Sequence, residues 1–426
     1  MSTASVAKRR GPIESGVPAW IAYDFINSIL IINGSIYFSK WLVQEQHVNT
    51  FWYDFTYAAS TILLLACLPL VGSILDLYLN GKLILLLSSV LMGVAACILP
   101  WLGNQQQYGY KIIGTLCMFG TINFMYQASF VPYNWLLTRL NGVNSQAEVA
   151  SVSGLGEGAG SLGSVAGAVL GVQLLKITFL SRSLNAHIDI FYWLAVIFLI
   201  LFAIDYWMLY LGMKLDQDSI PQESLRAIFR VSFELIRKPS KVRRFLFAFL
   251  LYADALLTVQ LNIPIYMRER IGLDDAAVPN AIALALFAGF IGALFYSWKL
   301  SRINLKGVII ATLVVWVVTL ILLGVTTSRI AFFILMSWSG VLYGVIWSVS
   351  RAYLIELAPS ERLGRAFGSY AVFERCASVV GPLAWGAVML LPLSLGTRYI
   401  FAFSTMSGLV LISAVLLLLK KGLISS

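Results

Sequence analysis

A carboxylate inside a long apolar segment is the first residue of this chain that could do chemistry. Asp24 lies about two turns into an apolar segment at 18–42. Such a segment can cross a bilayer, which takes about 20 residues, and a charge within it costs at least ~2.5 kcal/mol. Asn27 and Ser28 follow three and four residues later, on the same helical face. We therefore expect this face, with Tyr23 beside Asp24, to line a polar pathway for substrate or protons.

Further ionisable side chains within apolar segments are Glu157, Asp254, Glu374 and Arg375. Ionisable groups inside a membrane mark substrate or ion pathways by default, and buried carboxylates bind protons more tightly. Arg375 cannot lose its proton, so it needs a carboxylate on a neighbouring helix or an anionic ligand. Its neighbour Glu374 points about 100° away around the helix. For each of these charges, a structural ion pair that fixes helix packing is the alternative interpretation.

The composition indicates that membrane-spanning helices position these residues. Hydrophobic residues make up 59% of the chain and charged residues only 12%, a composition that no soluble core requires. Tryptophans near span ends, namely Trp20, Trp101 and Trp193, are expected to anchor helices at the membrane interface. We predict an all-α polytopic membrane protein with twelve spans, at 18–42, 52–76, 82–102, 110–136, 149–174, 190–213, 245–268, 278–300, 306–326, 329–352, 365–392 and 397–419.

A polar stretch divides these spans into two sets of six. We expect an N-terminal six-helix bundle at 1–214, a cytoplasmic linker with a basic amphipathic helix at 215–244, and a C-terminal bundle at 245–426. With both termini cytoplasmic, the cytoplasmic segments hold 21 of the 30 lysines and arginines and the opposite side holds 8. We therefore expect an integral protein of the inner or plasma membrane with both termini in the cytoplasm. The net charge of +10 reflects topology, so no nucleic-acid partner is expected.

Weak internal repeats favour a duplicated six-helix unit. Asn33 and Tyr37 in the first predicted span align with Asn262 and Tyr266 in the seventh. Asp24 has a near counterpart in Asp254. Internal repeats of this kind are typical of secondary transporters.

The turn between the second and third spans carries a further motif. Gly72 and Asp76 are followed by Asn80-Gly81-Lys82. Glycine allows helices to approach closely, and an aspartate can bond amides at a helix end or pair with a cation. We interpret Gly72, Asp76 and Lys82 as a cytoplasmic gate whose contact breaks when the two halves move. An ordinary turn is the alternative.

Glycines recur every four residues in the fifth predicted span. Gly163, Gly167 and Gly171 form one ridge along this helix. Small residues at this spacing let two membrane helices pack closely. We expect a structural role for the ridge.

No metal or cofactor site is expected. The four cysteines, which are Cys67, Cys97, Cys117 and Cys376, lie in apolar segments without ligand-like spacing and behave as small hydrophobes. The two histidines lie near segment ends. The chain has no Gly-x-x-x-x-Gly-Lys-[Ser/Thr] loop for ATP, so we expect a secondary transporter rather than an ATPase or another enzyme.

Several stretches, taken in order, resemble one family of transporters. The pattern Trp-x-x-Tyr-Asp-x-x-Asn-Ser from Trp20 resembles the vacuolar-effluxer-like branch of the major facilitator superfamily. That branch contains the autophagy-related vacuolar amino-acid permeases and their prokaryotic relatives. The other matching stretches are the Gly72–Asp76 motif, Tyr133-Asn134, Tyr252-Ala-Asp254 with Thr258, and the run 350–386.

The resemblance implies the major facilitator fold, with two pseudo-symmetric six-helix bundles around a site that alternates access. It implies outward transport of small organic solutes such as amino acids. The buried carboxylates, which bind protons more tightly than exposed ones, are the reason to expect proton coupling. The resemblance also implies that Asn134, Tyr252 and Thr258 lie on the substrate pathway. Because helix eleven neighbours helix seven in this superfamily, Asp254 is a possible partner of Arg375 when no substrate is bound.

Sixth helices are peripheral in this superfamily. Asp205, in the sixth predicted span, is therefore expected to reach the cytoplasmic interface and to carry no function. We expect the protein to be a monomer in the bilayer.

Two other functions are compatible with the sequence. An exporter of amphipathic drugs or lipids would use the same fold, with a cavity open sideways to lipid and lined by aromatic residues. A non-transporting membrane receptor or scaffold would carry large soluble loops, which this chain lacks.

Overall fold

The structure is a computed structural model, and it describes residues 16–78, 81–137, 140, 146–180, 185–212, 241–299, 304–357 and 363–419. The helices of the N-terminal half are α1 (Val17–Asn33), η2 (Gly34–Phe38), η3 (Trp41–Glu45), α2 (Thr50–Tyr78), α3 (Gly81–Gly103), α4 (Tyr108–Leu137), α5 (Gln146–Leu180) and α6 (Ala186–Gly212). The helices of the C-terminal half are α8 (Lys241–Glu269), α9 (Ala277–Trp298), α10 (Leu305–Val325), α11 (Arg329–Leu357), α12 (Leu363–Cys376), α13 (Val380–Met389) and α14 (Leu395–Leu418). Most of the predicted linker lies outside the described residues.

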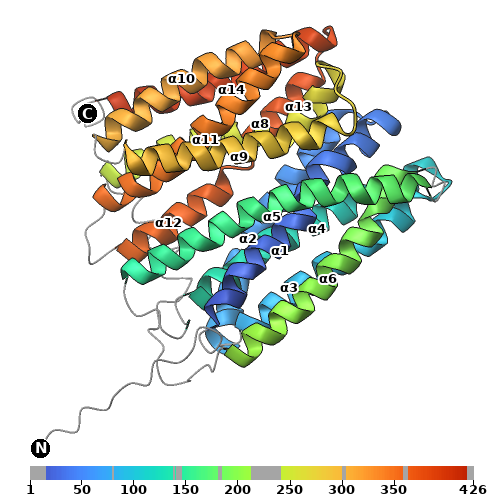
Figure 1. The fold of residues 1–426 in the computed structure, drawn as a ribbon, viewed down its shortest axis with the longest axis horizontal. Coiled ribbons are helices and arrows are strands. Elements are labelled where there is room, and N and C mark those ends of the chain that lie inside the picture. Colours follow the sequence, from blue (N-terminus) through green and yellow to red (C-terminus); the bar gives the residue numbers. More distant parts are fainter. Residues whose placement is uncertain are drawn as a thin grey trace, which may run out of the picture.

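The helices run side by side, and the two halves lie next to each other (Figure 1). Among the described residues, nine helices are long and apolar enough to cross a membrane. The three remaining predicted spans coincide with α2, α4 and the pair α12 and α13. Large apolar side chains such as Ile113, Phe290 and Ile330 are exposed on the surface of the structure, as expected for helices that face lipid.

Glycines allow α1 and α5 to approach closely. A Cβ atom at Gly163 would lie 2.2 Å from the carbonyl oxygen of Phe25, and one at Gly167 would lie 2.7 Å from that of Ile29. The predicted packing role of the α5 ridge is therefore confirmed. The C-terminal half uses the same device between α9 and α11, where a Cβ at Gly344 would lie 1.9 Å from the carbonyl oxygen of Gly289.

The eleventh predicted span is not one continuous helix. The segment predicted at 365–392 forms α12 and α13, separated by residues 377–379. Pro382 lies in the first turn of α13, where a residue without an N–H group costs nothing. The break therefore has a local signal, Gly381-Pro382, that the prediction of a continuous span overlooked.

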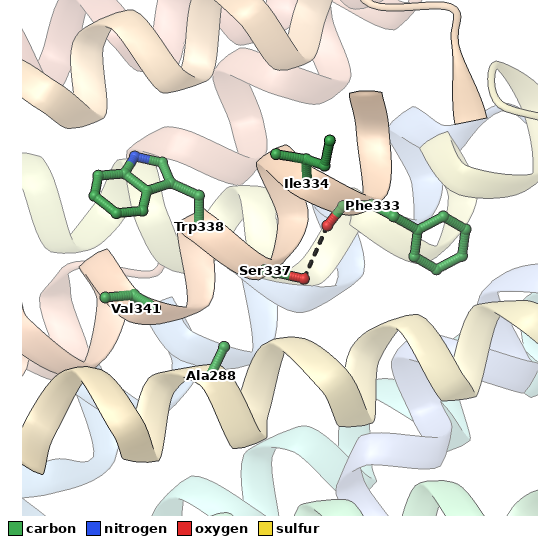
Figure 2. A pocket seen from close by; sticks show the side chains of 6 residues that line it. All are labelled: Ala288, Phe333, Ile334, Ser337, Trp338 and Val341. Carbon is green, nitrogen blue, oxygen red and sulfur yellow. Dashed lines mark hydrogen bonds between the residues drawn. The ribbon is translucent and has the colours of Figure 1, made fainter. Parts of the chain in front are cut away.

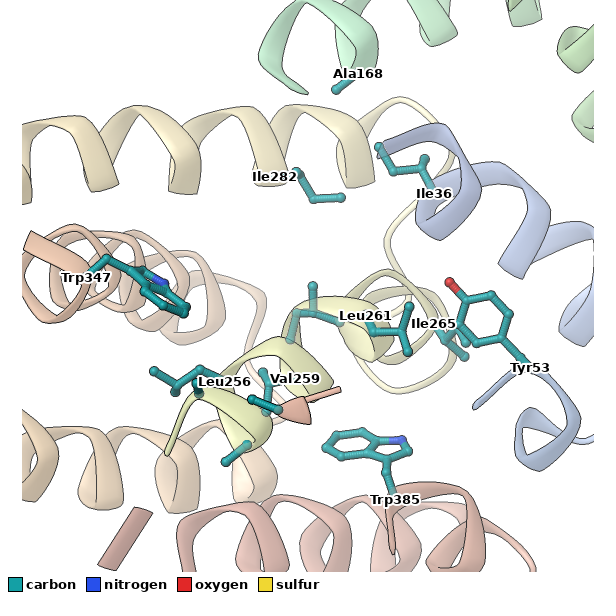
Figure 3. Close-up of a cluster of buried hydrophobic side chains, with 14 of the residues drawn as sticks. Ile36, Tyr53, Ala168, Leu256, Val259, Leu261, Ile265, Ile282, Trp347 and Trp385 are labelled. Atoms are coloured by element: carbon teal, nitrogen blue, oxygen red, sulfur yellow. The ribbon is translucent and has the colours of Figure 1, made fainter. Parts of the chain in front are cut away.

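The buried core is continuous across the two halves. One cluster of buried apolar side chains includes residues of both halves. Figure 3 shows part of it, with Ile36, Tyr53 and Ala168 from the N-terminal half near Leu261, Ile282 and Trp385 from the C-terminal half. Several hydrogen bonds join the halves in the part of the structure far from Val17, such as the bond from Asn49 Nδ2 to the Met389 carbonyl (3.4 Å). We call this contact the seam.

Candidate functional site

Asp24 and Arg375 carry opposite charges on facing halves of the molecule. The Asp24 carboxylate packs on α5, where a Cβ at Gly160 would lie 2.9 Å from Asp24 Oδ1. The positive charges of Arg375 and Arg351 act on this carboxylate, and the negative charge of Glu374 opposes them. The Asp24 and Arg375 charges therefore share one electrostatic environment.

Arg375 lies in the last turn of α12 and crosses to the N-terminal half. The helix dipole favours a positive charge at this end of a helix. The Arg375 guanidinium carbon lies 4.6 Å from the ring centroid of Phe130 on α4, which is a cation–π contact. Arg375 is only half-buried, so its hydrogen-bond donors can reach a ligand.

The pair of Arg375 with Asp254 that the sequence suggested is not formed, and that hypothesis was wrong. Asp254 Oδ2 instead accepts a hydrogen bond of 2.6 Å from the backbone N–H of Gly381, in the first turn of α13. Thr258 Oγ1 donates to the Asp254 carbonyl oxygen at 2.7 Å, next to the same turn. A helix end inside a membrane needs such a partner because no water can replace it. Asp254 therefore caps the break between α12 and α13.

Tyr252 also makes a helix-to-helix contact rather than facing a pathway. Its hydroxyl lies 2.6 Å from Ser350 Oγ on α11, and the side chain is only 1% exposed. The motif of the seventh predicted span thus places Tyr252, Asp254 and Thr258 in packing and capping positions.

The first motif of the chain builds an aromatic cluster inside the N-terminal half. Trp20 stacks on Tyr133 with ring centroids 4.1 Å apart, and its indole N–H donates to the Tyr133 carbonyl oxygen at 2.8 Å. Tyr23 packs on Tyr133, and its hydroxyl lies 3.0 Å from Ser89 Oγ. Trp20 is only 2% exposed, so its predicted role as an interface anchor was wrong.

The remaining predicted residues differ in their surroundings. Asn27 is fully buried, and both polar atoms of its amide find no hydrogen-bond partner among the described residues. Asn134 is exposed. The Lys82 ammonium lies 5.2 Å from the Tyr210 ring centroid. The side chains of Gly72, Asp76 and Glu157 lie outside the described part of the structure, so the predicted gate remains a prediction.

The structure adds tyrosines to the face shared by Asp24 and Arg375. The charges of both residues act on the Tyr126 hydroxyl. Tyr343 on α11 donates a hydrogen bond of 3.1 Å to Gln260 Oε1 and lies near Glu374 and Tyr126. Sequence reasoning missed these tyrosines because aromatic residues in a span carry no signal of the face on which they lie.

Asp205 does not reach an interface. It is 1% exposed, and neither carboxylate oxygen has a hydrogen-bond partner among the described residues. Its charge acts on the hydroxyls of Tyr23 and Tyr133. The prediction that Asp205 extends to the cytoplasmic surface was therefore wrong, because α6 turns this residue toward the aromatic cluster.

Charged residues close the seam at the helix ends far from Val17. His187 Nδ1 lies 2.5 Å from Glu45 Oε1, and His187 Nε2 lies 3.1 Å from Asp275 Oδ2, which also accepts from Lys40. Arg268 Nε lies 3.5 Å from Asp275 Oδ1. Burial alone would raise the pKa of Asp275, but the hydrogen bonds from His187 and Lys40 hold it well below its usual range. We call these five residues the seam cluster.

Two hollows lie away from the charged face. A groove of about 490 Å³ runs along α11 and borders α9. Figure 2 shows its lining, in which the one hydroxyl, on Ser337, bonds the Phe333 carbonyl oxygen at 2.9 Å. A hollow of about 200 Å³ lies at the seam, lined by Val43, His47, Val48, Asn49, Thr50, Glu269, Met389, Leu395 and Arg398. Of the two hollows, only the second offers charged groups.

Comparisons with known proteins agree with this architecture. The family model described as Major Facilitator Superfamily matches residues 245–423. The nucleoside transporter NupG is similar in structure, with a TM-score of 0.68 and 13% identity over 95% of this chain and 98% of that one. A structure of a proton dependent oligopeptide transporter gives a TM-score of 0.71 and 12% identity over 95% and 98% of the two chains. The chain therefore has the fold of these transporters, and its C-terminal half matches the family model.

Two curated relatives match most of the length of this chain. An uncharacterized MFS-type transporter, YxiO of Bacillus subtilis (strain 168), is 23% identical over 86% of both chains. An uncharacterized protein of Aquifex aeolicus (strain VF5) is 24% identical over 86% of this chain and 87% of its own. These relatives name no substrate, and a shared fold does not supply one.

The break between α12 and α13 is a feature that transporters use at substrate sites. Discontinuous helices place backbone dipoles and polar side chains near the middle of the bilayer. Here Arg375 lies in the last turn of α12, just before the break. After the break, Asp254 accepts a hydrogen bond from the backbone N–H of Gly381 at the start of α13. Candidate residues of the two halves therefore lie near this break.

Proposed function

We propose that this transporter moves a small organic solute that carries a carboxylate, such as an amino acid. The observation that supports the proposal is that Asp24 and Arg375, on different halves, carry opposite charges and that the Arg375 charge acts on the Asp24 carboxylate. Arg375 matches a carboxylate in a bidentate way, and Asp24 suits an ammonium group. A zwitterion would bridge the two halves and thereby hold an occluded state.

Movement of the two halves would provide alternating access. We propose that residues 1–214 and 245–426 form two bundles, joined by a cytoplasmic linker at 215–244, and that the protein acts as a monomer. With both termini in the cytoplasm, as we propose, the seam would close the outer side, and the seam cluster and Asn49 are among its contacts. Opening that side would require these contacts to break.

Proton coupling and outward transport complete the proposal. Buried acids that lack a strong cationic partner can exchange protons when their exposure changes. Similar solved structures include a proton dependent oligopeptide transporter and the human organic anion transporter MFSD10, for which the TM-score is 0.61 and the identity 16%. Solutes of this size and charge are compatible with the face shared by Asp24 and Arg375.

A thermal-shift screen of metabolites on the purified transporter tests the substrate class. A ligand at 100 times its Kd stabilises the folded state by ~2.7 kcal/mol, so a substrate should raise the melting temperature. We expect amino acids or small carboxylates to raise the melting temperature of the wild type. We expect this rise to be absent in Asp24→Asn. If only neutral or strongly amphipathic compounds raise the melting temperature, the proposed class is wrong.

Reporter fusions test the orientation. The asymmetry of 21 basic residues against 8 predicts that a reporter after Ser426 lies inside the cell. A reporter inserted in the loop after α3 should lie outside. The opposite result would place the seam on the cytoplasmic side of the membrane.

An exporter of amphipathic drugs or lipids is the second candidate. The groove of about 490 Å³ supports it, since Phe333, Trp338 and Ile334 line it and it borders α9. The charged face between the halves has no role in that function. Stabilisation by lipophilic compounds that is lost in Trp338→Ala, and kept in Asp24→Asn, would favour this candidate.

A further inference from the structure

A carboxylate and an amide join the two halves deep in the seam. Asp54 lies in the second turn of α2, and Asn262 lies in the last third of α8. Asn262 Nδ2 donates to Asp54 Oδ1 at 2.8 Å. Both side chains are fully buried. The sequence analysis assigned no role to Asp54.

Two oxygen atoms of this pair have no hydrogen-bond donor among the described residues. Asp54 Oδ2 and Asn262 Oδ1 are both buried, and neither has a hydrogen-bond partner among the described residues. Both are acceptors if Asp54 is ionised. If Asp54 carries a proton, its O–H can donate to Asn262 Oδ1 and close a two-bond ring between the carboxylic acid and the amide. One proton would then satisfy both atoms.

Among the described residues, none supplies a positive charge that would stabilise an ionised Asp54 carboxylate. The charge of Asp54 acts on two phenols, Tyr53 on α2 and Tyr399 on α14. The Tyr399 hydroxyl in turn donates a hydrogen bond to Glu269, which is itself acidic. From α13, Gly386 packs against it, since a Cβ there would lie 3.3 Å from Asp54 Cβ.

The seam cluster supplies no cation to Asp54 either. Its cations Lys40 and Arg268 pair with Asp275 instead. An unpaired, buried carboxylate destabilises the folded state, and binding a proton neutralises it.

The internal repeat shows that the amide does not require an acid. Asn33 is the counterpart of Asn262 in the N-terminal half. Its Nδ2 donates to the carbonyl oxygens of Ile29 (2.8 Å) and Gly167 (3.1 Å), both within its own half. Asn262 Nδ2 makes the same bond one turn back, to the Thr258 carbonyl at 3.2 Å, but its other partner is Asp54 across the seam. The acid is therefore the feature that distinguishes the second site.

We propose that Asp54 is a proton-binding site that closes the seam when it is protonated. The proton comes from water on the side of the seam, binds the Asp54 carboxylate, and forms the O–H bond to Asn262. When the halves part, Asp54 becomes exposed, and the proton returns to that water. Because the closed seam binds this proton more tightly than the open one, low pH favours closure and rising pH favours opening. The proposal rests on the proposed alternating access.

Distance measurements between spin labels test the site without any substrate. Gln107, in the loop after α3, and Thr327, in the loop before α11, are exposed and belong to different halves. With the four native cysteines replaced and these two positions labelled, the ratio of short to long distances reports closure. We expect this ratio to fall several-fold between about pH 5.5 and pH 8.5.

Two variants separate Asp54 from the rest of the seam. Asp54→Asn keeps both hydrogen bonds in an amide–amide pair, so it should stay closed at every pH. Asn262→Leu removes the pair and should lower the closed fraction even at low pH. His187→Gln in the seam cluster is the control, and the titration by Asp54 should persist in it.

Specific outcomes would overturn the proposal. The wild-type ratio could be independent of pH, or Asp54→Asn could keep the wild-type titration. A titration that disappears in His187→Gln would assign the effect to the seam cluster. Because the readout needs no solute, failure here leaves the proposed substrate class untouched, and a wrong substrate class leaves this result intact.

Discussion

Arg375→Lys should weaken substrate binding by about 10- to 100-fold while the yield of folded protein stays near the wild-type level. A hydrogen bond to a charged group contributes about 1.5–3 kcal/mol, which corresponds to this range. The guanidinium fork holds a carboxylate with two parallel bonds, whereas an ammonium acts as a single point charge. The lysine keeps the positive charge at the end of α12, so the helix dipole remains satisfied. The loss should therefore appear in binding rather than in folding.

Titration of a hit from the thermal-shift screen would measure this change. Arg398→Lys is the matched control, because Arg398 bonds the carbonyl oxygens of Leu393 (2.9 Å) and Met389 (3.2 Å) away from the charged face. Its affinity should equal that of the wild type. Wild-type affinity in Arg375→Lys would remove Arg375 from the site, and so would a confirmed substrate without a negative group.

Asp254→Ala should destabilise the protein by about 1–3 kcal/mol, the cost of leaving a buried hydrogen-bonding group unpaired. The group left unpaired would be the backbone N–H of Gly381, which donates a hydrogen bond of 2.6 Å to Asp254 Oδ2. Water cannot replace this bond inside a membrane. Asp254→Asn retains an acceptor oxygen, so it should lose much less stability than Asp254→Ala. The melting temperature in detergent would show this order of stabilities.

Asp205→Asn provides the control for Asp254. Asp205 is equally buried, but its oxygens have no partner among the described residues, so a neutral amide there should not lower the melting temperature. An Asp254→Ala protein as stable as the wild type would mean that α13 needs no cap. Equal losses in Asp254→Asn and Asp254→Ala would assign the effect to charge rather than to the hydrogen bond.

The sequence alone determined features that depend on length and local composition. A span needs about 20 apolar residues wherever it lies, so the positions of the helices could be predicted from apolar runs. The α5 glycine ridge could be predicted because small residues at a four-residue spacing lie on one helical face. The Gly381-Pro382 pair also carried the signal for the break in the eleventh span, although the prediction did not use it.

Only the tertiary structure decided which side chains meet. Arg375 lies over Phe130 rather than beside Asp254, Trp20 is buried against Tyr133, and Asp54 faces Asn262. Each of these pairs joins different helices, and its formation depends on the rotation and depth of both. A rotation of one residue, about 100°, turns a side chain from a facing helix to lipid without changing the apolar pattern of the span. Embedded charges could therefore be found in the sequence, but their partners could not.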